Sequence, residues 1–390
     1  MAVHRKMRGF CRALLLAVSL AALQAGAAQA QEANDLDRLS QQILDNPQDV
    51  ALNLRYAQAA EAAGKPRLAL TAYERILIND PSNHEARQGY ERVRRILEPG
   101  YTVARLETGV RWDSDPLNAN QGIFFFGNAP EATTYYGKLT IANEHTFAGL
   151  RFRSTLNVED DETPDISDIS YQYIGAQTGP ILFLGPHLAA LPAIGVSAAW
   201  LGGEQYYNEV NLSFAMEGRA GGASYWWRLR GGYRDYQHDT SSFFGPVTEN
   251  GEYYDFTAGY VRPHTLADRG TLSVEPFARW SNIKGGVFDF FIFDELSPGK
   301  YSEYGADVNY NYQLGDHVRA SVGALARERD FRSSSRQDTY LSPQASVTVQ
   351  RALACNCDIR FQYRYRNNDT NDAFFDYRAN QFSLSLTTRF

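Results

Sequence analysis

Apolar and polar positions follow two different patterns along this chain of 390 residues, and the change falls near residue 100. Between about 35 and 97 the pattern is that of amphipathic helices. From Tyr101 onward apolar and polar residues alternate, and this two-residue period predicts β-strands. The closing stretch, NQFSLSLTTRF, keeps the alternation to the last residue. The chain therefore predicts a short helical segment followed by a much longer β part.

The helical segment contains VALNLRYAQAAEAAGKPRLALTAYERILINDPSN, which is similar to a tetratricopeptide repeat, a helix–turn–helix of about 34 residues. The matching positions are Ala57, Gly64, Ala69, Tyr73 and Pro81. Small residues let two helices approach, and a tyrosine fills the remaining space. Helices on either side are expected to stack on this pair, since one repeat cannot bury its own apolar face. The segment is expected to dock a partner or cargo, and a generic helical hairpin is the simpler alternative.

The β part contains about fourteen alternating segments, and the connections between them indicate the architecture. Joins after even-numbered segments are short, such as TGPI, RAGG and LGDH. Several joins after odd-numbered segments are long, at 114–131, 160–167, 237–251 and 283–301. Outer-membrane barrels combine an even strand number with short periplasmic turns and longer external loops. The fold class predicted is an all-β transmembrane outer-membrane barrel of about fourteen antiparallel strands with a small N-terminal helical domain.

The first residues predict export. Residues 1–12 carry four basic side chains, and the apolar run ALLLAVSLAAL and the small residues AGAAQA follow. This is the pattern of a secretory signal peptide. The predicted division is a signal peptide at 1–30, a periplasmic helical domain at 31–99 and an outer-membrane barrel at 100–390 of a Gram-negative bacterium. Outer-membrane lipid and lipopolysaccharide are then expected partners.

The last strand is expected to pair with the first, because a closed barrel has no free edge. Its alternating apolar positions and terminal aromatic are similar to the signal by which the β-barrel assembly machinery recognises its clients. Phe382 and Phe390 are the residues predicted to carry that signal.

If apolar positions face lipid, the opposite face lines the lumen. Strands 11 and 13 are the richest in inward arginines, namely Arg319, Arg327, Arg329, Arg360, Arg364 and Arg366. One interpretation is an electropositive path for anionic cargo. The other is that arginines and acids interlock across the wall and stiffen it, and the sequence does not choose between them.

Charge and cysteines narrow the function classes. The formal charge is −7, and removal of the four basic signal-peptide residues leaves about −11, which argues against a nucleic-acid partner. Cys355 and Cys357 are expected to form a disulfide in a turn, since two sulfurs alone make a poor metal site. No nucleophile or metal motif is found, so neither catalysis, a metal nor a cofactor is expected.

The loops after odd-numbered segments are acidic or aromatic. VEDDETPDISD could bind divalent cations that bridge lipopolysaccharide, or be a solvated charged loop. GIFFFGNAP, SSFFGPV and GGVFDFFIFDELSPG place phenylalanines at the rim, where they could form a lid, contact a cargo or pack on one another.

A tetratricopeptide segment before a barrel of about fourteen strands resembles the surface lipoprotein assembly modifier family. The likeness lies in the repeat around Gly64–Pro81, in LETGVRWDSDPLN, and in the closing YRYRNNDTNDAFFDYRANQFSLSLTTRF. It implies a translocon that helps to export or display a lipoprotein or small protein. Two alternatives remain open: an export porin for an acidic exopolysaccharide, and a passive anion-preferring porin.

Overall fold

The computed structural model describes residues 36–80, 83–98, 100–118, 131–185, 188–220, 222–236, 250–266, 269–283, 299–352 and 357–390. Contacts divide the chain into two compact units, one comprising Met1–Pro99 with Thr146–Arg151 and the other Gly100–His145 with Phe152–Phe390. The predicted signal peptide (1–30) lies outside the described residues, as do Pro81, Cys355 and the phenylalanines of the three aromatic loops.

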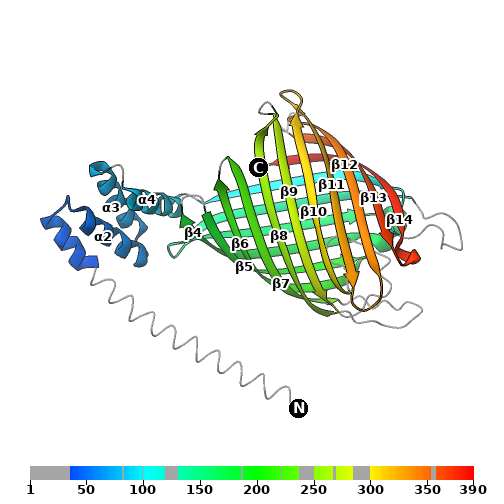
Figure 1. Ribbon diagram of the computed structural model, residues 1–390, viewed down its shortest axis with the longest axis horizontal. Coiled ribbons are helices and arrows are strands. Elements are labelled where there is room, and N and C mark those ends of the chain that lie inside the picture. Colours follow the sequence, from blue (N-terminus) through cyan, green and yellow to red (C-terminus); the bar gives the residue numbers. More distant parts are fainter. Residues whose placement is uncertain are drawn as a thin grey trace, which may run out of the picture. The chain divides into compact units, whose positions relative to one another are not determined.

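The helical unit is a series of antiparallel helices (Figure 1). A helical stretch over 36–45 is followed by α2 (Val50–Ala62), α3 (Pro66–Asn79) and α4 (His84–Leu97). The side chains of Asp49 and Asn83 cap α2 and α4 by accepting backbone N–H bonds of 3.0 Å. Gly64 turns the chain between α2 and α3 with φ +66°, a conformation that glycine adopts without strain.

Alanines and one tyrosine form the core of this unit. Ala57 and Ala69 are fully buried, and Tyr73 is 1% exposed. The Tyr73 hydroxyl donates to Glu61 at 2.7 Å, and Arg92 donates to the same carboxylate at 2.8 and 2.5 Å. Burial, and then the bond to Glu61, raise the pKa of Tyr73, while the bond to Glu61 raises the pKa of Arg92. Three helices are therefore joined at one satisfied carboxylate.

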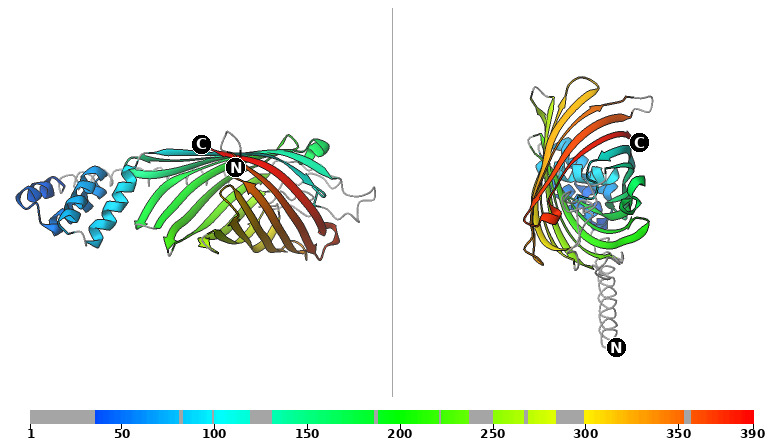
Figure 2. Two further views of the ribbon diagram at one scale, coloured as in Figure 1. Left: turned by 90° about the horizontal axis from the view of Figure 1, so that it is seen from above. Right: turned by 90° about the vertical axis from the view of Figure 1, so that its right-hand side faces the viewer.

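The second unit is a closed antiparallel barrel with fourteen strands in its described residues. The strands are β1 (Tyr101–Asp113), β2 (Ala132–Phe147), β3 (Leu150–Glu162), β4 (Tyr171–Gly185), β5 (Leu188–Leu201), β6 (Glu204–Ala220), β7 (Ala223–Tyr236), β8 (Asn250–Thr265), β9 (Gly270–Asn282), β10 (Lys300–Gln313), β11 (Val318–Phe331), β12 (Gln337–Val349), β13 (Asp358–Thr370) and β14 (Tyr377–Arg389). Short 3₁₀ turns lie at Pro164–Ile169 and Ala373–Phe375. Each strand pairs with its sequence neighbours, and the strands wrap into one tilted wall (Figures 1 and 2).

The barrel closes where the sequence predicts. β14 pairs with β1 from Gln381↔Asp113 to Arg389↔Arg105. Phe390 extends this pairing: its N–H donates to Ala104 at 2.9 Å, and its carbonyl accepts from Ala104 at 3.1 Å. The last residue thus belongs to the hydrogen-bonded seam.

Alternation separates an apolar outer face from a polar inner face. On β13, Phe361 is 53% exposed, while its neighbours Arg360 and Gln362 are half-buried. The exposed apolar side chains on other strands include Ile194, Val196, Leu212, Phe214, Leu229, Phe256, Val308, Val322, Val347 and Leu384. So much exposed apolar surface indicates a membrane-facing wall. None of the described helices is long and apolar enough to cross a membrane.

The connections differ between the two ends of the barrel, as predicted. We call the end where odd-numbered strands finish the loop end, and the other the turn end. Long connections at the loop end join β1 to β2, β7 to β8 and β9 to β10, whereas Leu201–Glu204 is a tight turn there. At the turn end the connections are short, such as Ala220–Ala223.

One predicted turn is wrong. TGPI (178–181) lies inside β4, which continues to Gly185. Thr178↔Ile194 and Leu182↔Ala190 keep one register, so Pro180 and Pro192 fall opposite each other in the gap between these pairs. Neither proline has a backbone N–H. Because the two are opposite each other, the strand ladder lacks hydrogen-bond donors at a single place. A Cβ on Gly179 would lie 1.8 Å from the Pro192 carbonyl oxygen, so only glycine allows this approach.

The predicted fold class is confirmed. The chain forms a closed antiparallel barrel of the outer-membrane type, with fourteen strands in the described residues and a small N-terminal helical region.

Candidate functional site

Inward side chains near the loop end surround a cavity of about 420 Å³ inside the barrel. The basic residues of its described lining are Arg111, Lys138, Arg230, Arg234, Arg327, Arg364 and Arg366. The acidic residues are Asp113, Glu159, Asp161 and Glu209. Tyrosines also line it, at positions 171, 173, 206, 207, 340 and 377. The described lining thus has seven basic and four acidic side chains, and Arg230 is also neutralised by Asp255, which lies outside the lining.

A row of alternating charge crosses six consecutive strands at this level. Its members, from β7 to β12, are Arg230, Asp255, Arg279, Glu303, Arg329 and Asp338, each directly opposite the next in register. Arg230 contacts Asp255 at 2.6 Å, Arg279 contacts Glu303 at 3.0 Å, and Arg329 contacts Glu303 at 2.5 Å. Opposite charges facing each other across strands stabilise the pairing. We call this set the charge row.

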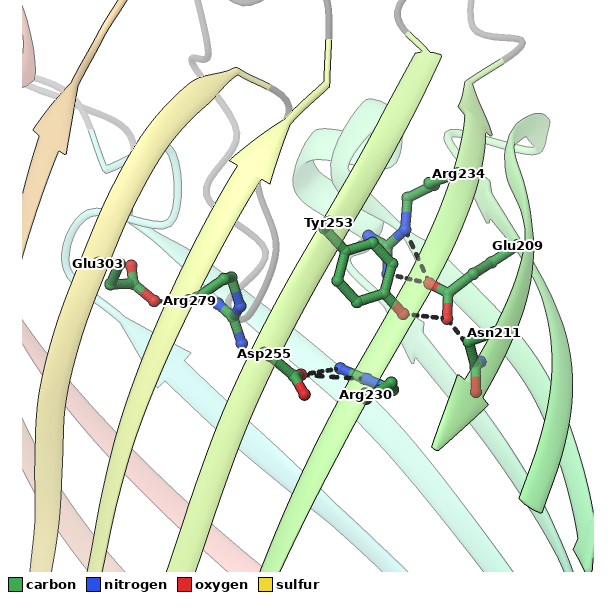
Figure 3. Close-up of polar contacts among 8 residues, drawn as sticks. All are labelled: Glu209, Asn211, Arg230, Arg234, Tyr253, Asp255, Arg279 and Glu303. Carbon is green, nitrogen blue, oxygen red and sulfur yellow. Dashed lines mark hydrogen bonds and ion pairs between the residues drawn. The ribbon is translucent and has the colours of Figure 1, made fainter. Parts of the chain in front are cut away.

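Beside the charge row, Glu209 on β6 is the centre of a buried polar cluster (Figure 3). Arg234 donates to its Oε2 at 2.6 and 2.9 Å, while Tyr253 and Asn211 donate to its Oε1 at 2.6 and 2.8 Å. The Arg234 guanidinium also lies 3.9 Å from the ring centre of Tyr207. Both carboxylate oxygens are therefore satisfied, and this cluster stiffens the wall.

The prediction that the acidic run VEDDETPDISD forms a loop is wrong for the first half of the run. Residues Glu159 to Glu162 belong to β3, and strand alternation directs every second side chain inward. Glu159 contacts Lys138 and Asp161 contacts Arg111, each at 3.0 Å. These acids neutralise cavity cations.

Arg366, near the end of β13, contacts the end of β1 and the connection that follows it. It contacts Asp113 at 2.6 Å and donates to the Asn118 side chain at 2.5 Å. Arg364, one inward position away, donates to the Gln344 amide oxygen at 3.2 Å and forms no ion pair with a described residue. The two arginines thus differ: Arg366 is in direct contact with a carboxylate, whereas Arg364 interacts with that of Asp307 only at longer range.

Glu303 is shared by three guanidinium groups. Arg279 binds its Oε1, Arg329 binds its Oε2, and Arg327 lies farther away at 3.7 Å. Arg329 is 2% exposed and lies against the Tyr301 ring at 4.3 Å. Arg279 and Arg329 also face Asp255 and Asp338 in the charge row, so Arg327 is the member of this trio that Glu303 serves least.

The six predicted lumen arginines have three kinds of position. Arg327, Arg364 and Arg366 line the cavity. Arg329 is buried in the charge row. Arg319 and Arg360 flank Thr348 across β12 nearer the turn end, half-buried and outside the described cavity lining.

The remaining predicted residues lie away from the cavity. The Phe382 ring packs against Trp112 and Tyr363 at 5.7 and 5.0 Å on the outer face of the seam, and Phe390 is 74% exposed. Cys357 is buried and disulfide-bonded, with Cys355 outside the described residues. The described residues contain no cluster of three or more metal-ligating side chains.

Glu209, Arg234, Glu303, Asp338 and Tyr340 were not among the sequence predictions. Strand parity would have found most of them: Glu303 shares the inward face with Asp307, and Arg234 shares it with Arg230. The cross-strand pairing that brings them together has no local signal.

Comparisons with known proteins find a family model that matches the C-terminal part of the chain. The family model described as "Putative beta-barrel porin 2" matches residues 295–390, which hold β10 to β14. No curated protein sequence matches the chain. Similar solved structures include the outer membrane channel DcaP of Acinetobacter baumannii, with 10% identity, TM-score 0.44, and 75% of this chain and 97% of that chain covered. OmpT of Vibrio cholerae has 10% identity, TM-score 0.43, and coverage of 75% and 100%. Pseudomonas aeruginosa OpdK with vanillate has 8% identity, TM-score 0.35, and coverage of 74% and 98%.

Proposed function

We propose that this protein is an outer-membrane channel that admits small anionic solutes in preference to cations. The observation that carries this proposal is the excess of basic over acidic side chains in the described lining of the lumen cavity. A ring of fixed positive charge lowers the electrostatic barrier for an anion and raises it for a cation.

The pairing pattern supports a net effect. Five of the seven basic side chains are each matched by a nearby acid, namely Arg111, Lys138, Arg230, Arg234 and Arg366. Arg364 forms no ion pair with a described acid and interacts with Asp307 only at longer range, and Arg327 shares Glu303 with two closer arginines. The two interpretations of the lumen arginines are therefore both in use: most interlock with acids, and a few remain to act on a solute.

The comparisons favour solute passage over lipoprotein assembly, because the family model that matches β10 to β14 is one of porins. In this proposal the helical unit is periplasmic and docks a partner. No observation on its described residues favours an exported lipoprotein or a polysaccharide as that partner.

The test is the reversal potential of the purified full-length protein in a planar bilayer under a KCl gradient. We expect chloride to permeate better than potassium. Arg364→Gln removes an unmatched lumen charge and should lower the chloride preference, whereas Arg105→Gln, at an exposed ion pair near the turn end, should change it less. A preference for potassium in the unaltered protein would refute the proposal.

A further inference from the structure

Arg327 is a buried cation with too little to bind. It lines the cavity and is 8% exposed. Its side chain donates no hydrogen bond to a described residue, its Nε has no partner there, and its one ion pair, with Glu303 Oε2, is 3.7 Å long. That oxygen already accepts from Arg329 at 2.7 Å. A buried charge whose one ion pair is long and shared is poorly compensated, so this position favours a bound counter-ion.

The surroundings of Arg327 indicate the shape of that counter-ion. Its guanidinium lies 4.6 Å from the ring centre of Tyr340, which is directly opposite it on β12. Arg364, held by the amide oxygen of Gln344, lines the same cavity from β13. The planar guanidinium fork matches a carboxylate, and tyrosine rings stack on flat ring bodies.

We propose that Arg327 and Arg364, with Tyr340 beside them, form a binding subsite for a small aromatic carboxylate within the lumen. The inference rests on the proposed anion channel and deepens it: the pore holds one class of solute at a defined place. The guanidinium of Arg327 binds the carboxylate, Arg364 adds a second positive charge, and the tyrosines of the lining contact the ring.

The experiment measures chloride current through the full-length protein while benzoate is added, with benzamide as a neutral molecule of nearly the same shape. We expect benzoate to reduce the current saturably and benzamide to have little effect. Arg327→Gln should raise the half-blocking concentration of benzoate about tenfold, the usual consequence of losing one charged hydrogen bond. Arg319→Gln, which removes an equal charge from the same strand outside the cavity lining, should change it much less.

A second pair of variants guards against a folding defect at Arg327. Arg364→Gln and Arg360→Gln lie on β13, one in the cavity lining and one outside it, and should differ in the same way. Arg327→Lys should keep the chloride preference and weaken benzoate block, because an ammonium lacks the planar fork.

Several outcomes would overturn the subsite. Equal half-blocking concentrations for the members of each pair would do so, as would block by benzamide as strong as that by benzoate. Chloride preference without saturable benzoate block would remove the subsite and leave the channel standing. If the unaltered protein shows no preference for chloride, the proposed anion channel is refuted as well.

Discussion

At the scale of single residues, the lumen is organised by carboxylates that each serve more than one donor. Glu209 accepts from Arg234, Tyr253 and Asn211, and Glu303 from Arg279 and Arg329. Shared acceptors order several side chains with one charge. Because one carboxylate serves several donors, some guanidinium groups have no close carboxylate of their own, and these groups are available to a solute.

Replacing Glu303 should therefore be severe. Glu303→Gln removes the carboxylate that three guanidinium groups share. We expect the free energy of unfolding to fall by about 3–5 kcal/mol, as when one partner of a buried ion pair is removed. The measurement is the urea midpoint of the barrel reconstituted in lipid vesicles. Glu328→Gln, which alters an outer-face contact with Tyr304, is the control and should shift the midpoint little. Equal shifts in both variants would contradict this account.

The direction of a lumen side chain could be predicted from the sequence, but its partner could not. Parity alone directs Arg364 and Arg366 inward. It cannot tell that Arg366 is ion-paired with Asp113, 253 positions earlier, while Arg364 donates to an amide oxygen and forms no ion pair with a described residue. That difference depends on barrel closure and on the exact register of β13, β14 and β1. The cavity was for this reason beyond sequence reasoning.

At the scale of elements, helix packing in the N-terminal unit depends on one close contact. Gly89 on α4 lies against the Tyr73 ring, and a Cβ at this position would be 2.2 Å from Cζ. Gly89→Val should overpack the core by about 1–3 kcal/mol and loosen α4. Limited trypsin digestion of the full-length protein should then cut faster within α4. Gln88→Val, at an exposed neighbouring position, should leave the digestion rate unchanged.

The closing strand supports a second prediction at this scale. Deleting Phe390 removes the terminal pair with Ala104 and the exposed aromatic predicted to be an assembly signal. We expect less folded barrel in the outer membrane, measured by heat-modifiable gel migration. Phe390→Tyr keeps both features and should assemble normally. Equal amounts of folded barrel with and without residue 390 would reject the signal.

Most elements could be predicted from the sequence because alternation continues through each strand. The exception is instructive. Gly179 and Pro180 have the composition of a turn. They nevertheless lie within paired strands, because Pro192 on β5 is opposite Pro180 on β4. A local turn signal contains no information on the partner strand, which here also has a proline without an N–H at the paired position.

At the scale of the whole molecule, the electrostatic account predicts how selectivity depends on salt. Charges facing a water-filled lumen are screened over about 10 Å at 0.1 M and about 3 Å at 1 M salt. The chloride-to-potassium permeability ratio should therefore fall as KCl is raised on both sides of the bilayer. A ratio that stays constant over this range would indicate that pore geometry, and not the excess of arginine, sets the preference.

The charge row has a consequence for how the strands find their partners during insertion. A slip of one residue turns a strand inside out and is opposed by the apolar pattern, but a slip of two residues preserves that pattern. In the charge row such a slip would move Glu303 from Arg279 to Ser281 or Phe277 and leave an arginine unmatched. Asp255 on β8 would lose Arg279 in the same way. At β10–β11 and β7–β8, by contrast, such a slip can bring Glu303 opposite Arg327 and Asp255 opposite Arg228. Around Arg279 the row therefore opposes the one register error that hydrophobic alternation tolerates.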